Sequence, residues 1–412
     1  MIESGSKEFF WGVATSAHQV EGGLSNDWTP WEKENSQRKV ESAKSKKWPD
    51  YILERYPSPF EEENYISGMA ADQYRRFTED VGLMATLGIN AHRFSIEWSR
   101  VEPEEGKFSD EAIRHYRAVI RALREKGIEP FVTLWHWTHP VWFSKKGGWE
   151  SKTAVEDFLR FAKRLADEFR NDVTFWIVLN EPGMWAADAY LFGTKPPGER
   201  SFSSLVRVYF SLVRAQRQVY AVLKKINPDC EIGIAESMEY ISHSGVRALW
   251  NYFRNFFFIS RVRSSLDFIG VNYYKRVGLW GKDAGQVSDM GWEIYPEGLG
   301  YLLRRIAKFK KPLYVTENGI ADARDAKRSE FIRRHVEEVI RAKKEGVPVK
   351  GYFYWSLLDN FEWNDGFWPR FGLFEVDYKT EERIPRESAR VYAEIIKKSQ
   401  ISNSKFQTNS KF

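Results

Sequence analysis

The sequence has a single cysteine, Cys230, among its 412 residues. An intramolecular disulfide and a cysteine-cluster metal site are therefore excluded. No apolar run approaches the roughly eighteen residues that a membrane-spanning helix requires. The N-terminus also lacks the basic segment and long apolar core of a secretory signal. We therefore expect a cytoplasmic protein that does not span a membrane.

The sequence also lacks a strong imbalance of charge. Its 62 Lys and Arg residues and 57 Asp and Glu residues give a net charge of +5. Such a mixture is typical of a solvated surface, so we expect no nucleic-acid partner. The one dense basic stretch, 38–47, is expected to form a mobile surface loop, with a polyanion site as the alternative. Abundant Lys, Arg and Glu with one Cys fit a thermophilic source.

Aromatic residues, in contrast, are abundant, with 17 Trp, 19 Tyr and 29 Phe. They can fill a large hydrophobic core, or they can stack on the flat apolar faces of a ligand such as a sugar ring. The composition fits both uses.

Eight short apolar runs recur along the chain, at 9–18, 89–98, 128–137, 173–182, 231–238, 266–274, 312–319 and 349–359. Continuous apolar runs are typical of parallel strands that are buried on both faces. Between them lie stretches with helical spacing of apolar residues, at 70–88, 110–127, 153–169, 201–226 and 327–346. This alternation predicts an α/β fold, a (β/α)8 barrel.

A doubly wound open sheet is the alternative fold. It is disfavoured because no Gly-x-Gly-x-x-Gly turn follows the first apolar run. We expect one barrel domain with loop insertions over 1–398. The tail at 399–412 lacks a packing pattern and is expected to be disordered.

Polar and aromatic side chains follow the ends of these strands, where barrels of this kind carry their chemistry. They include Gln19, Arg93, His136, Trp137, Asn180, Glu181, Asn272, Tyr274, Glu317, Trp355, Glu362 and Trp363. No cluster has metal-ligand spacing and no nucleophilic serine elbow is present, so we expect no metal and no cofactor. Two carboxylates on different strands, among amides and stacking rings, are typical of glycosidic bond cleavage.

Longer motifs match a known family. They are FFWGVATSAHQVEG (9–22), HRFSIEWSRVEP (92–103), LWHWTHPVW (134–142), LNEP (179–182), DFIGVNYY (267–274), YVTENG (314–319), YWSLLDNFEW (354–363) and RFGLFEVDY (370–378). On these motifs the chain resembles the family 1 glycoside hydrolases, the β-glucosidase and β-galactosidase group, over nearly its whole length. The resemblance implies retaining, exo-acting hydrolysis of small-molecule β-glycosides through a covalent glycosyl-enzyme.

The resemblance also implies a role for each residue at the strand ends. Glu181 is the expected general acid/base and Glu317 the nucleophile, with their carboxyl groups roughly 5–5.5 Å apart. Arg93 and Tyr274 are expected to hold Glu317 ionised, and Asn272 to order the side chain of Glu181. The expected substrate contacts are Gln19, His136, Trp137, Asn180, Trp355, Glu362 and Trp363.

The resemblance also bears on the sugar. Members that act on 6-phosphorylated sugars carry a phosphate clamp near the position of Glu362. A carboxylate there repels phosphate, so unphosphorylated glycosides are expected. The pattern leaves the sugar open between glucose, galactose and mannose, and it indicates no particular oligomeric state.

Two departures from the family pattern stand out. Glu97 replaces a smaller residue and is expected to be a satisfied carboxylate at the rim, although it could compete for Arg93. The segment 247–265 replaces a longer one and is rich in aromatic residues with interleaved arginines. It is either a buried helix of the outer ring or an apolar, basic-flanked surface near the aglycone entrance. Such a surface would favour alkyl or aryl aglycones, or would touch a membrane surface.

Two other functions fit parts of the pattern. An endo-acting cellulase or mannanase also uses Glu on the fourth and seventh strands, but the HWTHP and NFEW motifs favour a closed pocket for one terminal sugar. A non-catalytic sugar-binding protein has no reason to keep both Glu181 and Glu317. The sequence therefore favours a retaining β-glycosidase.

Overall fold

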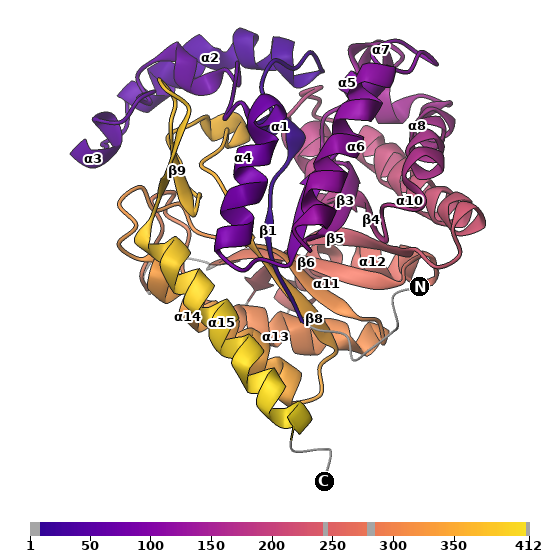
Figure 1. The fold of residues 1–412 in the computed structure, drawn as a ribbon. Coiled ribbons are helices and arrows are strands. Elements are labelled where there is room, and N and C mark those ends of the chain that lie inside the picture. The colour runs from indigo at the N-terminus through magenta and orange to yellow at the C-terminus, as the bar shows by residue number, and fades with distance from the viewer. Residues whose placement is uncertain (1–8, 242–245, 278–284, 409–412) are drawn as a thin grey trace.

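The computed structural model describes residues 9–241, 246–277 and 285–408, and these form a closed barrel of eight parallel strands (Figure 1). The strands are β1 Phe10–Ala14, β2 Ala91–Ser95, β3 Glu129–Trp135, β4 Phe175–Asn180, β5 Glu231–Ile241, β6 Phe268–Val277, β7 Leu313–Asn318 and β8 Val349–Trp355. Each strand pairs with its neighbour in chain order, and β8 pairs with β1 to close the ring. The predicted (β/α)8 barrel is confirmed, and each apolar run overlaps one strand.

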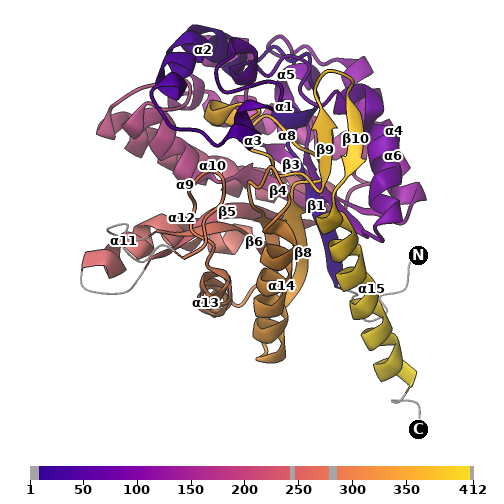
Figure 2. The same ribbon diagram turned by 90° about the vertical axis from the view of Figure 1, so that its left-hand side faces the viewer.

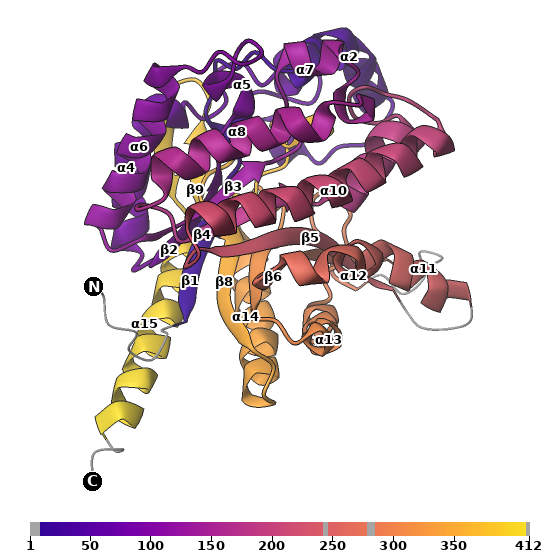
Figure 3. The same ribbon diagram turned by 90° about the vertical axis from the view of Figure 1, so that its right-hand side faces the viewer.

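Helices surround the barrel (Figures 1 and 3). Five coincide with the stretches of helical spacing: α4 Gln73–Thr86, α6 Asp110–Glu125, α8 Ala154–Phe169, α10 Phe202–Ile226 and α14 Arg328–Lys344. Longer helices that the spacing did not predict are α2 Trp28–Lys44, α11 Val246–Asn255, α13 Pro296–Ile306 and α15 Glu387–Thr408. The shorter ones are α1 Ala17–Val20, α3 Asp50–Leu53, α5 Trp98–Val101, α7 Val141–Lys145, α9 Pro182–Ala187, α12 Phe257–Val262, η1 Glu62–Tyr65, η2 Gly148–Glu150, η3 Asp188–Phe192, η4 Arg263–Ser265, η5 Ala307–Phe309 and η6 Trp363–Asp365.

The apolar side chains form two layers, one inside the barrel and one between the barrel and its helices. Inside, the rings of Phe131 and Phe175 stack with centroids 4.2 Å apart, and Phe353 meets Phe131 edge-on at 4.9 Å. Burying a side chain of this size stabilises the fold by roughly 1.5–3 kcal/mol. Much of the aromatic content therefore fills the hydrophobic core, which is one of the two uses that the composition allows.

The expected surface loop at 38–47 is wrong, because α2 continues through Lys44. Val40 and Ala43 are buried on one side of this helix. Within 38–47 these two small apolar residues are the buried positions among many charges, and they give too weak a periodic signal to be recognised. A further element that the sequence did not predict is the hairpin of β9 Phe374–Asp377 and β10 Glu382–Pro385.

The C-terminal helix α15 closes the molecule across the junction of the first and last strands. The Tyr392 hydroxyl donates to the carbonyl oxygen of Gly12 on β1 at 2.7 Å and to that of Tyr352 on β8 at 3.3 Å. The helix continues through Thr408, into the segment 399–412 that was expected to be disordered. Residues 409–412 lie outside the described residues, so the disordered tail stays a prediction.

The segment 247–265 is divided between the two alternatives proposed for it. Phe258, Ile259 and Val262 of α12 are buried in the layer around the barrel. Helix α11 projects from the side of the barrel (Figures 2 and 3). Its exposed apolar side chains are Leu249 at 60%, Trp250 at 56%, Tyr252 at 43% and Phe253 at 50%. Within the described parts of the chain, no helix combines the length and apolar character that crossing a membrane requires.

Candidate active site

A cavity of about 270 Å³ opens at the carboxyl ends of the barrel strands. Ten of the twelve predicted residues line it: Gln19, His136, Trp137, Asn180, Glu181, Tyr274, Glu317, Trp355, Glu362 and Trp363. The other two, Arg93 and Asn272, are fully buried and contact the lining residues through hydrogen bonds. The structure therefore brings all twelve together, from strands that are far apart in the sequence.

The backbone at the end of β4 aims Glu181 into this cavity. Glu181 has φ of 48°, in the left-handed region that residues with a side chain rarely adopt. Its N–H donates to the carbonyl oxygen of Ala235 on β5 at 2.7 Å, and Pro182 begins α9 directly after it. Trp137 and Trp363 also have positive φ, at 78° and 49°. Unfavourable backbone conformations of this kind concentrate at functional sites.

Glu317, at the end of β7, is held by a cation and a phenol. Arg93 Nη1 lies 2.5 Å from Glu317 Oε1, and the Tyr274 hydroxyl donates to Glu317 Oε2 at 2.7 Å. Glu97 does not take Arg93 away, because its carboxylate accepts instead from the hydroxyls of Ser99 at 2.7 Å and Thr138 at 2.8 Å. Glu97 therefore does not compete with Glu317 for Arg93.

Glu181 is held by an amide and by no cation. Asn272 Nδ2 donates to Glu181 Oε1 at 2.8 Å, and Asn272 is fixed in turn by the Thr316 hydroxyl, which donates to its Oδ1 at 2.7 Å. Among the described residues Glu181 forms no ion pair within 4.0 Å. The two carboxyl groups thus share one cavity but differ in their partners.

This difference separates their protonation. Burial, reinforced by the negative charge of Glu317, raises the pKa of Glu181 to about 7. Burial also raises the pKa of Glu317, whereas the charge of Arg93 and the hydrogen bond from Tyr274 lower it. Arg93 opposes protonation of Glu317 as expected, but burial has the larger effect on the pKa of Glu317. A single proton shared by the pair is held more favourably on Glu181, because a proton on Glu317 would face the Arg93 guanidinium.

Asn180 joins Arg93 of β2 to His136, which follows β3. Its Oδ1 accepts from Arg93 Nη2 at 2.7 Å, and its Nδ2 lies 3.0 Å from His136 Nε2. Burial and the charge of Arg93 lower the pKa of His136, so the imidazole is neutral and its Nε2 can accept from the amide. This side of the cavity therefore presents fixed, uncharged polar groups, which suit sugar hydroxyls.

Glu362 is held by Gln19, whose Nε2 donates to Glu362 Oε2 at 3.2 Å and to Asn360 Oδ1 at 2.9 Å. Burial and the charge of Asp365 raise the pKa of Glu362 to about 8. Its carboxyl therefore holds a proton at neutral pH more readily than an exposed glutamate does. The argument that Glu362 repels a phosphate by its charge is weaker than the sequence implied.

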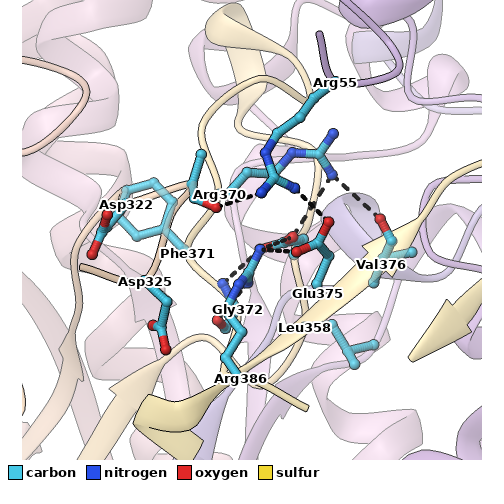
Figure 4. Close-up of polar contacts among 12 residues, drawn as sticks. Arg55, Asp322, Asp325, Leu358, Arg370, Phe371, Gly372, Glu375, Val376 and Arg386 are labelled. Carbon is cyan, nitrogen blue, oxygen red and sulfur yellow. Dashed lines mark hydrogen bonds and ion pairs between the residues drawn. The ribbon is translucent and has the colours of Figure 1, made fainter. Parts of the chain in front are cut away.

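The loop after β8, which carries Asn360 and Glu362, rests on a buried ion cluster. Asp359 accepts from Arg386 through both carboxylate oxygens, at 2.8 and 2.7 Å, and from the Gly372 N–H at 2.9 Å. Figure 4 shows Arg386 and Arg55 reaching Glu375 from two sides, with Arg370 donating to the carbonyl of Val376. The cluster ties this loop to β9 and to the start of α15.

Lys195 is a cavity residue that sequence reasoning missed. It is buried, its Nζ lies 3.2 Å from the centroid of the Trp137 ring, and it pairs with Asp188 Oδ2 at 3.2 Å. It lies in the long connection after β4, fourteen residues beyond Glu181 and away from any strand end, so no strand-end rule points to it. Burial lowers its pKa.

The cavity is also more apolar than the sequence suggested. Met184, Met238, Met290 and Trp292 line it. Met184 lies three residues after Glu181 on α9, a spacing that could have indicated a shared face. Met290 and Trp292 come from the connection after β6, which the sequence did not relate to the site.

The described residues contain no group of three or more His, Cys, Asp or Glu side chains that could hold a metal ion. Cys230 is buried and free. The reactive groups of this cavity are its carboxyls.

The model of glycosyl hydrolase family 1 matches residues 3–245 and 275–401. The interval between the two matched stretches contains the aromatic segment 247–265. β-Glucosidase A of Thermotoga maritima is 32% identical over an alignment that covers 94% of this chain and 97% of that protein. A β-galactosidase of Pyrococcus woesei is 28% identical, with coverage of 95% and 96%.

Solved structures with the same fold include a β-glycosidase from Pyrococcus horikoshii. It is 34% identical with a TM-score of 0.84, over 95% of this chain and 94% of that one. The β-glucosidase from Thermotoga maritima in complex with deoxynojirimycin is 30% identical, also with a TM-score of 0.84, over 97% and 99% of the two chains.

Proposed function

This chain belongs to glycosyl hydrolase family 1 and is a β-glycosidase, and we propose that Glu181 and Glu317 carry out its double-displacement reaction. The observation that carries this assignment is the unequal support of the two carboxyls. Glu317 contacts a guanidinium and a phenol, whereas among the described residues the side chain of Glu181 has an amide as its polar partner. Such an environment keeps one carboxyl as an anion and the other as an acid.

In the first step Glu317 attacks the anomeric carbon while Glu181 gives its proton to the glycosidic oxygen. The bond to the aglycone breaks, and a covalent glycosyl-enzyme forms on Glu317. Negative charge leaves Glu317 at this point, which lowers the pKa of Glu181 and releases the proton more easily. Asn180 is placed to donate to a sugar hydroxyl while Arg93 and Asn272 hold its oxygen.

In the second step Glu181, now ionised, removes a proton from water, and the water attacks the anomeric carbon. Glu317 leaves as a carboxylate, which the Arg93 guanidinium stabilises. Both inversions together retain the β configuration. Gln19, His136, Trp137, Trp355, Glu362 and Trp363 form the proposed pocket for the terminal sugar.

Nitrophenyl β-glucoside hydrolysis by Glu317→Gly tests the assignment. We expect activity to fall on the order of 10⁴-fold or more, because no covalent intermediate can form, and we expect azide to restore turnover by attacking from the space left empty. Glu239→Gln is the matched control, because Glu239 lines the same cavity without a proposed chemical role. Undiminished activity of Glu317→Gly would refute the nucleophile.

We further propose that the enzyme favours apolar aglycones over a second sugar. Met184, Met238, Met290 and Trp292 line the cavity beside the proposed catalytic pair. Arg254 of α11 donates to the carbonyl oxygen and hydroxyl of Ser237 at 2.8 and 3.0 Å, which joins α11 to the cavity rim. An alkyl chain leaving the cavity would therefore pass methionine and aromatic side chains.

A series of alkyl β-glucosides compared with cellobiose tests this preference. We expect kcat/KM to rise with chain length, by up to about fourfold per buried methylene, and we expect Trp292→Ala to flatten the rise. Ile384→Ser on β10 is the control, since it changes an exposed apolar residue away from the cavity. A preference for cellobiose without any gain from chain length would contradict the proposal.

The exposed side chains of α11 also support the proposal that 247–265 touches a membrane surface. Leu249, Trp250 and Phe253 supply the apolar contact. We expect the wild type and Ile384→Ser to co-sediment with anionic lipid vesicles, and we expect Trp250→Ser not to. Equal sedimentation of both variants would contradict it. The cytoplasmic location expected from the sequence stays a prediction.

A further inference from the structure

A second cavity, larger than the catalytic one, lies on the other side of the segment that follows η3. Its volume is about 540 Å³, within the range of roughly 300–1,000 Å³ that is usual for small-molecule sites. It is bordered by the start of α2, by α7 and by residues 196–199. None of the proposed catalytic or sugar-binding residues lines it.

The floor of this cavity consists of three buried polar side chains, Asp27, His139 and Tyr190. The backbone N–H of His139 donates to Asp27 Oδ1 at 2.9 Å. Asp27 Oδ2 lies 3.4 Å from His139 Nε2 and accepts no hydrogen bond from the described residues. A Cβ atom on Gly148 would lie 3.7 Å from the Tyr190 hydroxyl and 3.8 Å from His139 Nε2. Gly148, which has no side chain, therefore lies against both groups.

The three floor groups are uncharged at neutral pH. His139 Nδ1 lies 3.3 Å from the carbonyl oxygen of Trp137 and donates to it, which leaves Nε2 as an acceptor. Burial lowers the pKa of His139 to about 4 and raises the pKa of Asp27 to about 8. The floor thus offers an acid proton, an imidazole lone pair and a phenol.

The charged residues at the rim do not favour a ligand of either sign. Glu150 pairs with Arg207 at 2.5 Å, and Lys146 pairs with Glu105 at 2.5 Å and with Asp157 at 2.8 Å. Glu34, Lys145 and Glu199 also line the cavity, so its charged residues carry both signs. An uncharged ligand rich in hydroxyls fits such a site better than an ion does.

The walls add the flat apolar surface that a sugar ring requires. Trp31 lines the cavity together with Pro30, Pro196 and Pro197. An indole of this kind stacks on the C–H face of a pyranose while the hydroxyls at the ring edge reach polar groups. The Ser144 hydroxyl also borders the cavity, and it has no hydrogen-bond partner among the described residues.

We propose that this cavity is a second carbohydrate site, which binds a neutral monosaccharide such as the glucose released at the first. The two sites share their walls. Lys195 lines the catalytic cavity, and the next residue, Pro196, lines the second one. Trp137 likewise lines the catalytic cavity, and His139, two residues further on, lines the second one. Binding of a sugar at the second site does not depend on the proposed function. Only the release of that glucose by the enzyme itself rests on the proposed function.

Titration of the full chain with glucose tests the proposal, with deoxynojirimycin present at saturation to fill the catalytic cavity. We expect one equivalent of glucose to bind with Kd on the order of 1 mM. Tyr190→Phe, which removes one hydroxyl, should weaken this binding about fivefold. Ser144→Leu, which fills the cavity from α7, should abolish it. Tyr220→Phe, whose hydroxyl bonds to Asp267 elsewhere, should bind as the wild type does.

Two results would overturn the second site. One is the absence of glucose binding once deoxynojirimycin is bound, and the other is unchanged binding in both Tyr190→Phe and Ser144→Leu. Nitrophenyl β-glucoside hydrolysis is measured in parallel and should remain within about twofold of wild type in both variants, because neither residue touches the catalytic cavity. If the wild-type chain failed to hydrolyse the glucoside, the proposed function would be contradicted. The amount of glucose bound at the second site would be unaffected.

Discussion

At the scale of single residues, the two carboxyls illustrate how environment assigns roles to identical side chains. Glu181 and Glu317 are both buried in one cavity. The Arg93 guanidinium and the Tyr274 hydroxyl favour the anion at Glu317. Glu181 has neither contact, so burial and the neighbouring charge make the proton harder to remove.

The raised pKa of Glu181 predicts the pH profile. The general acid works in its protonated form, so kcat/KM should fall as the pH rises through about 7, the value to which burial and the charge of Glu317 raise this pKa. In Glu181→Gln this alkaline limb should disappear. Hydrolysis of an alkyl β-glucoside should fall on the order of 10²–10⁴-fold, and that of a nitrophenyl glucoside should fall less, because its leaving group needs no proton.

Glu239→Gln is the control for the pH profile, and it should keep the alkaline limb. An unchanged limb in Glu181→Gln would assign the titration to another group, with Glu362 next in line because burial raises its pKa to about 8.

The sequence identified residues at strand ends and not those in long connections. Glu181 and Glu317 stand in short motifs directly after apolar runs, so the barrel rule alone collects them at one rim. Lys195 and Trp292 lie in long connections, and where such segments fold depends on contacts with distant parts of the chain. The protonation of Glu362 was equally beyond the sequence, because it follows from burial.

At the scale of elements, the loop after β8 depends on the buried pair of Asp359 and Arg386. Two parallel hydrogen bonds join them, and both side chains are buried. Burial opposes the ionised form of Asp359, but Arg386 outweighs it, and the pKa of Asp359 is lowered. Its contribution to stability is therefore present above the ordinary pKa of an aspartate and is lost as the pH falls through the lowered value.

Arg386→Ala should destabilise the protein by about 3–5 kcal/mol, because it leaves a buried carboxylate without its partner. Arg390→Ala on α15 is the control, since Arg390 and Glu387 form an exposed pair whose loss should have little effect. Urea unfolding followed by circular dichroism measures both.

Two further outcomes follow from the same pair. The difference in stability between Arg386→Ala and wild type should narrow in acid, where Asp359 takes up a proton. KM should also rise, because the loop that carries Asn360 and Glu362 loses its anchor. Equal stability of the two variants at neutral pH would show that the pair does not hold this loop.

Elements were predicted where their pattern is regular and missed where it is not. The eight strands and five of the ring helices have continuous apolar runs or apolar residues at helical spacing. Helix α2 is highly charged with few buried positions, and the β9–β10 hairpin consists of strands of only four residues. Contacts with the rest of the molecule, such as the one between Arg55 and Glu375 of β9, decide these elements.

At the scale of the whole molecule, the barrel is closed by pairing its first and last strands. Register fixes Gly12 beside Phe353, and Tyr392 of α15 covers this junction with hydrogen bonds to both strands. Tyr392 and Ile396 are buried there. The C-terminal helix is therefore part of the domain and not an appendage.

Truncation separates this helix from the predicted tail. A chain ending at 400 should keep its thermal midpoint and its activity, because the buried contacts of α15 precede that point. A chain ending at 386 loses the burial of Tyr392 and Ile396, which contribute roughly 1.5–3 kcal/mol each, and should unfold at a clearly lower temperature. If both truncations were equally destabilising, the tail at 399–412 would have to be packed.

The sequence alone determined the fold class and the family and indicated the proposed site residues, because strand periodicity and short motifs are local patterns. Tertiary structure decided how those residues are used. Only packing shows that Arg93 reaches Glu317 and not Glu97, that Lys195 enters the catalytic cavity, and that α11 projects from the barrel. The second cavity likewise joins Asp27, His139 and Tyr190 from three connections. Hydrogen bonds and desolvation depend on distances through space, and spacing along the chain does not encode them.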